Sequence, residues 1–185
     1  PNLRTRWEDI RNDTLLKANG LPKQWKFNIP SLRRKVEVVS GGHLLLVGAR
    51  PNTGKTSFHA SLIAGPEGWA RQGAKCVVLC NEEAYERVGA RYLSAASNMS
   101  MDEVKANVAL ARSRYEPVRA NIRIKDSTNK DMQWVESLVK QEKPDVLILD
   151  MGDKFASKTS DKSDVYLKDA AIYARNIAKQ YNCCV

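Results

Sequence analysis

Short apolar runs alternate with longer helix-like segments along most of this chain. The clearest run is residues 146–149 (Val-Leu-Ile-Leu), and residues 76–80 (Cys-Val-Val-Leu-Cys) have the same character. Strands that are apolar on both faces are typical of parallel sheets covered by helices on both sides. Parallel strands also need long, usually helical, connections between them. The sequence therefore predicts an α/β fold with a mostly parallel central sheet flanked by helices.

The same patterns predict where each element lies. We expect strands at residues 43–47, 75–80, 121–125 and 146–149, with another beginning at 183. We expect helices at residues 54–64, 83–97, 101–115, 130–142 and 164–180. Ser100 and Glu103 have the capping-box spacing, which supports a helix start at 101. Residues 1–38, with a short helix at 3–17 and a turn at 29–31, are predicted to be a linker or arm, and residues 39–185 the core.

One loop carries the strongest functional motif, Ala49-Arg50-Pro51-Asn52-Thr53-Gly54-Lys55-Thr56-Ser57. It follows a predicted strand and opens a predicted helix, the context of a Walker A phosphate-binding loop. Backbone N–H groups and the helix N-terminus attract anions there, and Gly54 allows phosphates to approach closely. Lys55 would neutralise phosphate oxygens and the Thr56 hydroxyl would ligate Mg²⁺. Ala49 replaces the usual first glycine, but we expect all of residues 49–57 to bind Mg-ATP.

Acidic residues follow two of the predicted strands. Asp150 ends an apolar run, where an unpaired buried charge would be costly, so a Walker B carboxylate that holds Mg²⁺ is the better explanation. Asn81-Glu82-Glu83 follow another strand, at the edge where open α/β sheets bind ligands. We favour Glu82 as the group that activates the attacking water. Both glutamates could instead simply favour the first turn of the next helix.

Together these motifs resemble the replicative helicases of the DnaB type (superfamily 4), including those of bacteriophages and mitochondria. The resemblance covers residues 27–185. The loop at 49–57 has that family's form, including the alanine in first place. Glu82 with the residues that follow it matches the family's glutamate motif, and residues 144–150 match its Walker B strand. Other matching residues are Glu86, Arg91, Leu93, Ser94 and Ala95, and residues 124–128 and 174–185.

The resemblance implies a RecA-like ATPase domain in which Lys55 and Thr56 bind nucleotide and Mg²⁺. Lys55 and Glu82 would be catalytic, with Glu82 as the base, and Asp150 would be the Walker B ligand of Mg²⁺. It further implies a motor that translocates on single-stranded DNA, 5′ to 3′, as a ring-shaped homo-oligomer, a hexamer when complete. We also expect that the family's sensor glutamine, later DNA loops and arginine finger lie beyond Val185.

The resemblance places a DNA-contacting loop at residues 151–163. Its candidate phosphate contacts are Lys154, Lys158 and Lys162. An ordinary solvated loop explains these lysines equally well. The family often has glutamine where this chain has Asp153, so the loop's coupling to nucleotide is expected to differ.

Charge and cysteine usage are compatible with this interpretation. The net charge of +9 would attract nucleic acid, although scattered solvated lysines and arginines would give the same total. No apolar run approaches the roughly 18 residues of a membrane span, and we expect a cytoplasmic protein with no membrane partner. The cysteines lack the spacing of a zinc site and are expected to be buried free thiols. They are Cys76, Cys80, Cys183 and Cys184.

Two other functions would use the same nucleotide site. One is a recombinase or clock-type ATPase of the same superfamily, although the form of residues 82–95 favours a helicase. The other is an assembly module in which ATP binding organises subunits without productive turnover. ATPase measurements with and without single-stranded DNA separate that module from the other two.

Overall fold

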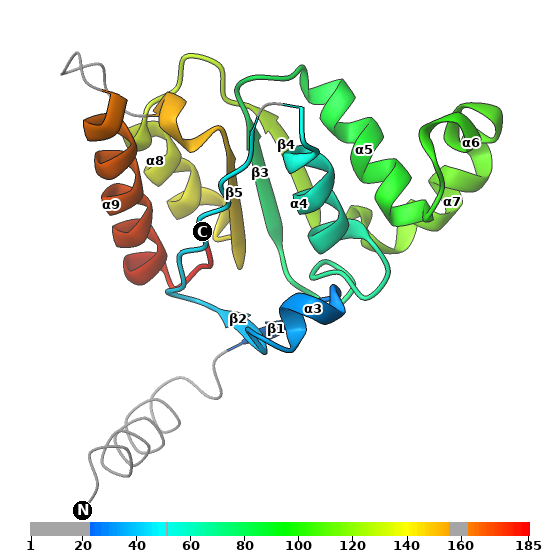
Figure 1. Ribbon diagram of the computed structural model, residues 1–185, viewed down its shortest axis with the longest axis horizontal. Coiled ribbons are helices and arrows are strands. Elements are labelled where there is room, and N and C mark those ends of the chain that lie inside the picture. Colours follow the sequence, from blue (N-terminus) through cyan, green and yellow to red (C-terminus); the bar gives the residue numbers. More distant parts are fainter. Residues whose placement is uncertain (1–22, 51, 156–162) are drawn as a thin grey trace, which may run out of the picture.

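The computed structural model describes residues 23–50, 52–155 and 163–185, and its centre is a three-stranded parallel sheet (Figure 1). The strand order is β4-β3-β5, with β3 at Cys76–Cys80, β4 at Ile122–Asp126 and β5 at Val146–Asp150. The three strands end in register, since Cys80 pairs with both Asp126 and Asp150. The groups that follow these strands are therefore brought to one edge of the sheet. The predicted fold class is confirmed.

Two extended segments continue the sheet beyond β5. Cys184 forms a parallel bridge with Val146, and Leu45 in turn donates to Val185 O at 2.8 Å. The predicted strand at 43–47 is wrong in extent, because its backbone pairing reaches only Leu45. Leu46, beyond that pairing, is 74% exposed.

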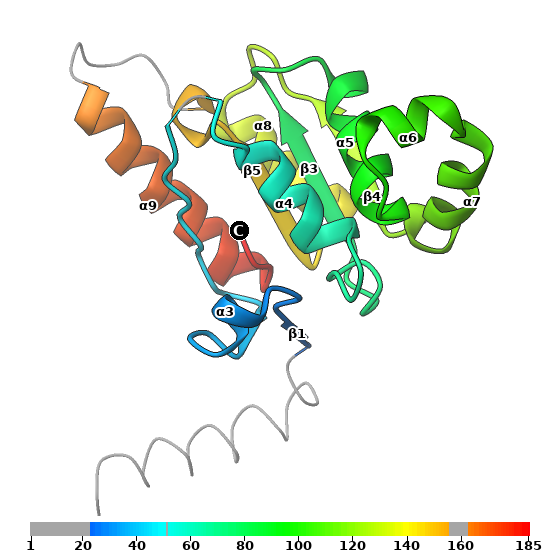
Figure 2. The ribbon, with the colours of Figure 1, turned by 45° about the vertical axis from the view of Figure 1, so that its right-hand side comes forward.

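Four helices cover the two faces of the sheet. They are α4 (Lys55–Ala64), α5 (Tyr85–Ser97), α8 (Met132–Glu142) and α9 (Ser163–Tyr181). Because strand side chains alternate, Cys76, Val78 and Cys80 join the apolar cluster of α4 and α5. Val77 and Leu79 join the cluster of α8 and α9. Figures 1 and 2 show these helix pairs on opposite sides of the sheet.

Two short helices stand where one long helix was predicted. These are α6 (Met101–Ala106) and α7 (Val108–Arg119), which lie away from the sheet beyond α5 (Figure 1). The capping box of Ser100 and Glu103 is present as predicted. The single helix was wrong because Asn107 adopts φ −143° and ψ 73°, and its side chain caps Leu110 N at the start of α7.

The segment before the core contributes to the core. Strands β1 (Gln24–Lys26) and β2 (Val38–Ser40) pair antiparallel, and α3 (Pro30–Arg33) begins at the predicted turn. Trp25, Phe27 and Val39 are buried among side chains of α4 and the loop after it. Phe27 packs edge-on against Trp69 with 5.5 Å between ring centroids. The domain boundary at 38/39 stays a prediction, and the predicted helix at 3–17 lies outside the described residues.

None of the helices in the described part of the chain is both long and apolar enough to cross a bilayer.

Candidate nucleotide-binding site

The loop before α4 has the backbone of an anion-binding nest. Asn52 and Gly54 have positive φ angles of 61° and 89°, and α4 begins at the next residue, Lys55. Thr53 Oγ1 donates to Arg50 O at 2.6 Å and closes the loop. No side chain caps the N-terminus of α4, so the N–H groups of its first turn are available to a ligand. Pro51 lies outside the described residues, and Ala49 and Arg50 are exposed.

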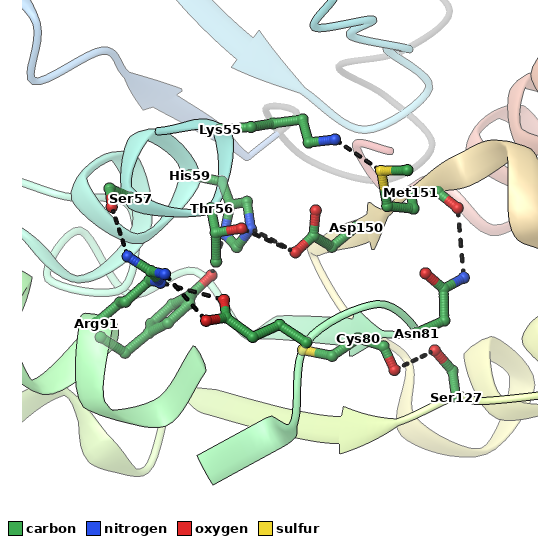
Figure 3. Close-up of polar contacts among 12 residues, drawn as sticks. Lys55, Thr56, Ser57, His59, Cys80, Asn81, Arg91, Ser127, Asp150 and Met151 are labelled. Carbon is green, nitrogen blue, oxygen red and sulfur yellow. Dashed lines mark hydrogen bonds and ion pairs between the residues drawn. The ribbon is translucent and has the colours of Figure 1, made fainter. Parts of the chain in front are cut away.

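The loop's hydroxyl residue and the acidic residue of β5 meet. Thr56 Oγ1 donates to Asp150 Oδ2 at 3.2 Å (Figure 3). Asp150 is 5% exposed, and its other oxygen, Oδ1, is buried with no hydrogen-bond partner among the described residues. A buried carboxylate oxygen left unpaired is costly unless something else completes it. A hard cation such as Mg²⁺, which takes oxygen ligands, fits this donor set.

The electrostatic surroundings keep Asp150 charged. Burial alone would raise the pKa of its carboxyl group. The neighbouring His59, Thr56 and Lys55 outweigh that effect, and together they hold the pKa of Asp150 below its ordinary value. The carboxylate is therefore ionised at neutral pH, the form that binds a metal ion.

Lys55 points across the site toward the residue after Asp150. Its Nζ donates to Met151 Sδ at 2.7 Å (Figure 3). Met151 has a positive φ of 65°, which is uncommon for a residue with a side chain. A thioether is a weak acceptor, so phosphate oxygens would compete easily for this ammonium group.

The two glutamates predicted as candidate bases differ in their surroundings. Glu83 is held by Arg91 of α5, through Nε at 3.2 Å and Nη2 at 3.0 Å. Glu82 is exposed and makes no ion pair or side-chain hydrogen bond within the described part of the chain. Helix α5 begins at Tyr85, two residues later than predicted, so both glutamates lie in the loop after β3.

Two further residues belong to the site although no role in it was predicted for them. Asn81 donates from Nδ2 to Met151 O at 3.3 Å, and its Oδ1 is buried without a partner among the described residues. His59 is buried on α4, with Nε2 3.6 Å from Asp150 Oδ2 and Nδ1 2.9 Å from the Tyr92 hydroxyl. Asn81 follows a strand, as Glu82 does, and that position could have indicated it. Nothing local in the sequence indicates His59, because its partners come from other elements.

Of the lysines predicted to contact DNA, the structure describes one. Lys154 is exposed in the 3₁₀ helix η2 (Gly152–Phe155), directly after Met151. Lys158 and Lys162 lie outside the described residues. Lys154 is thus displayed beside the nucleotide edge of the sheet.

All four cysteines are buried free thiols, as predicted. Burial raises the pKa of Cys80 to about 12, of Cys183 to about 11 and of Cys184 to about 12, and raises that of Cys76 well above its ordinary value. The thiols are therefore protonated and unreactive at neutral pH.

Known proteins share both the sequence pattern and the fold. A family model described as an AAA domain matches residues 20–185. The ATPase domain of a phage helicase superimposes with a TM-score of 0.72 at 18% identity, covering 99% of this chain and 67% of that one. A DnaB-like replicative helicase, described together with its interactions with primase, gives 0.73 at 18% identity. This second match covers 99% of this chain but 46% of the helicase, so the chain spans less than half of that protein. A search of curated proteins found no match.

The predicted resemblance to DnaB-type ATPase domains is thus confirmed at the level of the fold. The family model covers most of the chain, including the phosphate loop, Glu82 and Asp150. The chain belongs to the AAA-domain family of P-loop ATPases.

Proposed function

We propose that this chain is the motor domain of a ring-shaped replicative DNA helicase, which hydrolyses Mg-ATP to translocate on single-stranded DNA. The observation that carries the proposal is the meeting of Lys55, Thr56 and Asp150 at the carboxyl edge of the sheet. The likeness of the whole chain to two helicase-type ATPase domains supports it.

In this proposal the loop at residues 49–57 surrounds the phosphates with its N–H groups, and Lys55 leaves Met151 to bind phosphate oxygens. Thr56 Oγ1 and Asp150 would hold Mg²⁺, with Asp150 Oδ1 as the unpaired oxygen. Mg²⁺, when bound, neutralises charge on the phosphate oxygens. Glu82, unpaired and next to Asn81, would orient the attacking water and accept its proton.

Lys154, Lys158 and Lys162 would follow the phosphates of single-stranded DNA. Such contacts depend on charge and not on base sequence, as a translocating motor requires. The self-assembled ring, a hexamer, and the 5′-to-3′ direction are carried over from the DnaB-type relatives.

The test is a set of three measurements on the full-length protein: nucleotide affinity, ATPase rate with and without single-stranded DNA, and strand separation on a forked duplex. We expect DNA to stimulate ATPase, and Asp150→Asn to abolish turnover. Asp102→Asn, an exposed residue on α6, is the matched control and should change neither. ATP binding without DNA-stimulated turnover would instead indicate a nucleotide-gated assembly module. DNA-stimulated ATPase without unwinding would favour a recombinase-type ATPase.

A further inference from the structure

A buried polar pair lies directly behind the proposed Mg²⁺ site. His59 on α4 is one helical turn after Lys55 and Thr56, so the three side chains lie along one side of the helix. Its Nδ1 is 2.9 Å from the hydroxyl of Tyr92, which lies on α5 and is fully buried. Its Nε2 is 3.6 Å from Asp150 Oδ2 (Figure 3). The imidazole therefore lies between a buried hydroxyl and the carboxylate of Asp150.

The direction of the hydrogen bond follows from what each group needs. The buried hydroxyl of Tyr92 requires an acceptor, and His59 Nδ1 is the one it has among the described residues. If Tyr92 donates to Nδ1, the ring proton is on Nε2, facing Asp150. The opposite tautomer would leave the tyrosine hydrogen without an acceptor and point a nitrogen lone pair at a carboxylate. Both arguments place the proton on Nε2.

The two oxygens of Asp150 then have different surroundings. Oδ2 accepts from Thr56 and faces the N–H of His59. Oδ1 is buried and has no partner in the described part of the chain. His59 Nε2 likewise lacks a hydrogen-bond partner there, and an approach of about 0.5 Å would bring it within bonding distance of Oδ2. The carboxylate is approached by donors on one oxygen only, which leaves the other for a ligand.

We propose that His59 is a positioning residue for the Mg²⁺ ligand Asp150, and that Tyr92 sets the ring's tautomer. Through its Nε2–H, His59 would hold Oδ2 and direct Oδ1 toward the metal. This inference rests on the proposed Mg-ATP site. Partners that orient metal ligands typically contribute about 10-fold to 100-fold in metal affinity.

The test compares four variants of the full-length protein. His59→Leu removes the donor at similar volume, and His59→Gln keeps an N–H at the end of the side chain. Tyr92→Phe removes the hydroxyl that holds Nδ1. Leu62→Val, also buried on α4 but facing the apolar cluster, is the control for a purely structural loss. Mn²⁺ binding, followed by electron paramagnetic resonance with ADP present, reports the metal site independently of turnover. Nucleotide affinity is measured with Mg²⁺ and with EDTA.

We expect His59→Leu to weaken Mn²⁺ binding by about 10-fold or more, and Tyr92→Phe by a smaller factor. Nucleotide affinity in EDTA should stay the same, and His59→Gln should recover most of the metal affinity. Leu62→Val should lower Tm while Mn²⁺ affinity is retained. Wild-type metal affinity in His59→Leu overturns the inference, as does an equal loss with and without metal. A wild-type protein that binds no nucleotide overturns the proposed function and this inference with it.

Discussion

Arg91 holds the carboxylate of Glu83 with two hydrogen bonds, at 3.2 Å and 3.0 Å, so the neighbouring loop residues Glu82 and Glu83 are not equivalent. The same guanidinium lies 3.5 Å from Ser57 Oγ on α4. Its hydrogen bonds with Glu83 raise the pKa of Arg91 further, so the pair is charged at every ordinary pH. Glu83 is thus occupied in joining the loop to α5, and Glu82 remains available to a water molecule.

Glu82→Gln should lower DNA-stimulated ATPase by about 100-fold or more at near-normal nucleotide affinity, because a general base acts in the transition state. Glu83→Gln should have a much smaller effect on turnover. Steady-state ATPase of the full-length protein, with nucleotide affinity in parallel, measures both. If Glu83→Gln is the inactive variant, the assignment is wrong by one residue. Normal turnover in both variants would place the base outside this loop.

Lys55→Ala should abolish Mg-ATP binding and leave the fold intact. The lysine contacts a thioether sulfur and no part of the apolar core, so its replacement removes a phosphate ligand and little packing. Titration with a fluorescent ATP analogue measures the affinity, and circular dichroism checks the fold. Lys130→Ala, an exposed lysine before α8, is the control and should bind normally. Unchanged affinity in Lys55→Ala would contradict the assignment of the phosphate loop.

Replacing Lys154, Lys158 and Lys162 together by alanine should weaken single-stranded DNA binding by the ring and reduce its salt dependence. For each DNA phosphate that is no longer neutralised, the log–log slope of affinity against salt should fall by about 0.7. Lys105, Lys130 and Lys179 are exposed lysines on other elements, and their triple replacement keeps the net charge change equal. The two triple variants separate a local interaction from a general electrostatic effect. Equal slopes in both would show that the loop does not follow the DNA backbone.

The contact between α8 and α9 should depend on pH through Glu136. Hydrogen bonds from Tyr181 at 2.6 Å and Tyr173 at 2.8 Å, with Lys140 at 3.1 Å, lower the pKa of Glu136 to about 2. Because the folded pKa lies below the ordinary value of 4.5, this contribution to stability is present above pH 4.5 and is lost as the pH falls toward 2. Glu136→Gln should therefore lower Tm at pH 7, and the difference from wild type should shrink over that interval. A Tm difference independent of pH would contradict the assignment.

Much of the fold could be predicted because its strands are buried on both faces. Residues 76–80 and 146–149 have no polar side to confuse the pattern, and the phosphate loop is a local motif. The pairing of β1 and β2 was missed because each strand has three residues, too few for an alternation to be recognised. The break at Asn107 was missed because an asparagine inside a helical pattern becomes a cap only when the backbone turns there.

The site was predictable where the chemistry lies on adjacent residues and not where it depends on tertiary contacts. Lys55, Thr56 and Asp150 follow from motifs that have a known position relative to a strand. The contacts of His59 with Tyr92 and Asp150 join α4, α5 and β5, and no spacing along the chain indicates them. Asn81 was identified as part of a strand end, but its bond to Met151 O required the neighbouring strand to be in place.

The burial of all four thiols makes site-specific labelling straightforward. A maleimide reacts with exposed thiolate, which Cys76, Cys80, Cys183 and Cys184 do not offer at neutral pH. A cysteine introduced at an exposed position, such as Lys154, would react selectively without removal of the native ones. Dyes placed in this way could report the distance between the loop and a labelled DNA strand during nucleotide turnover, while the interior of the protein keeps its own residues.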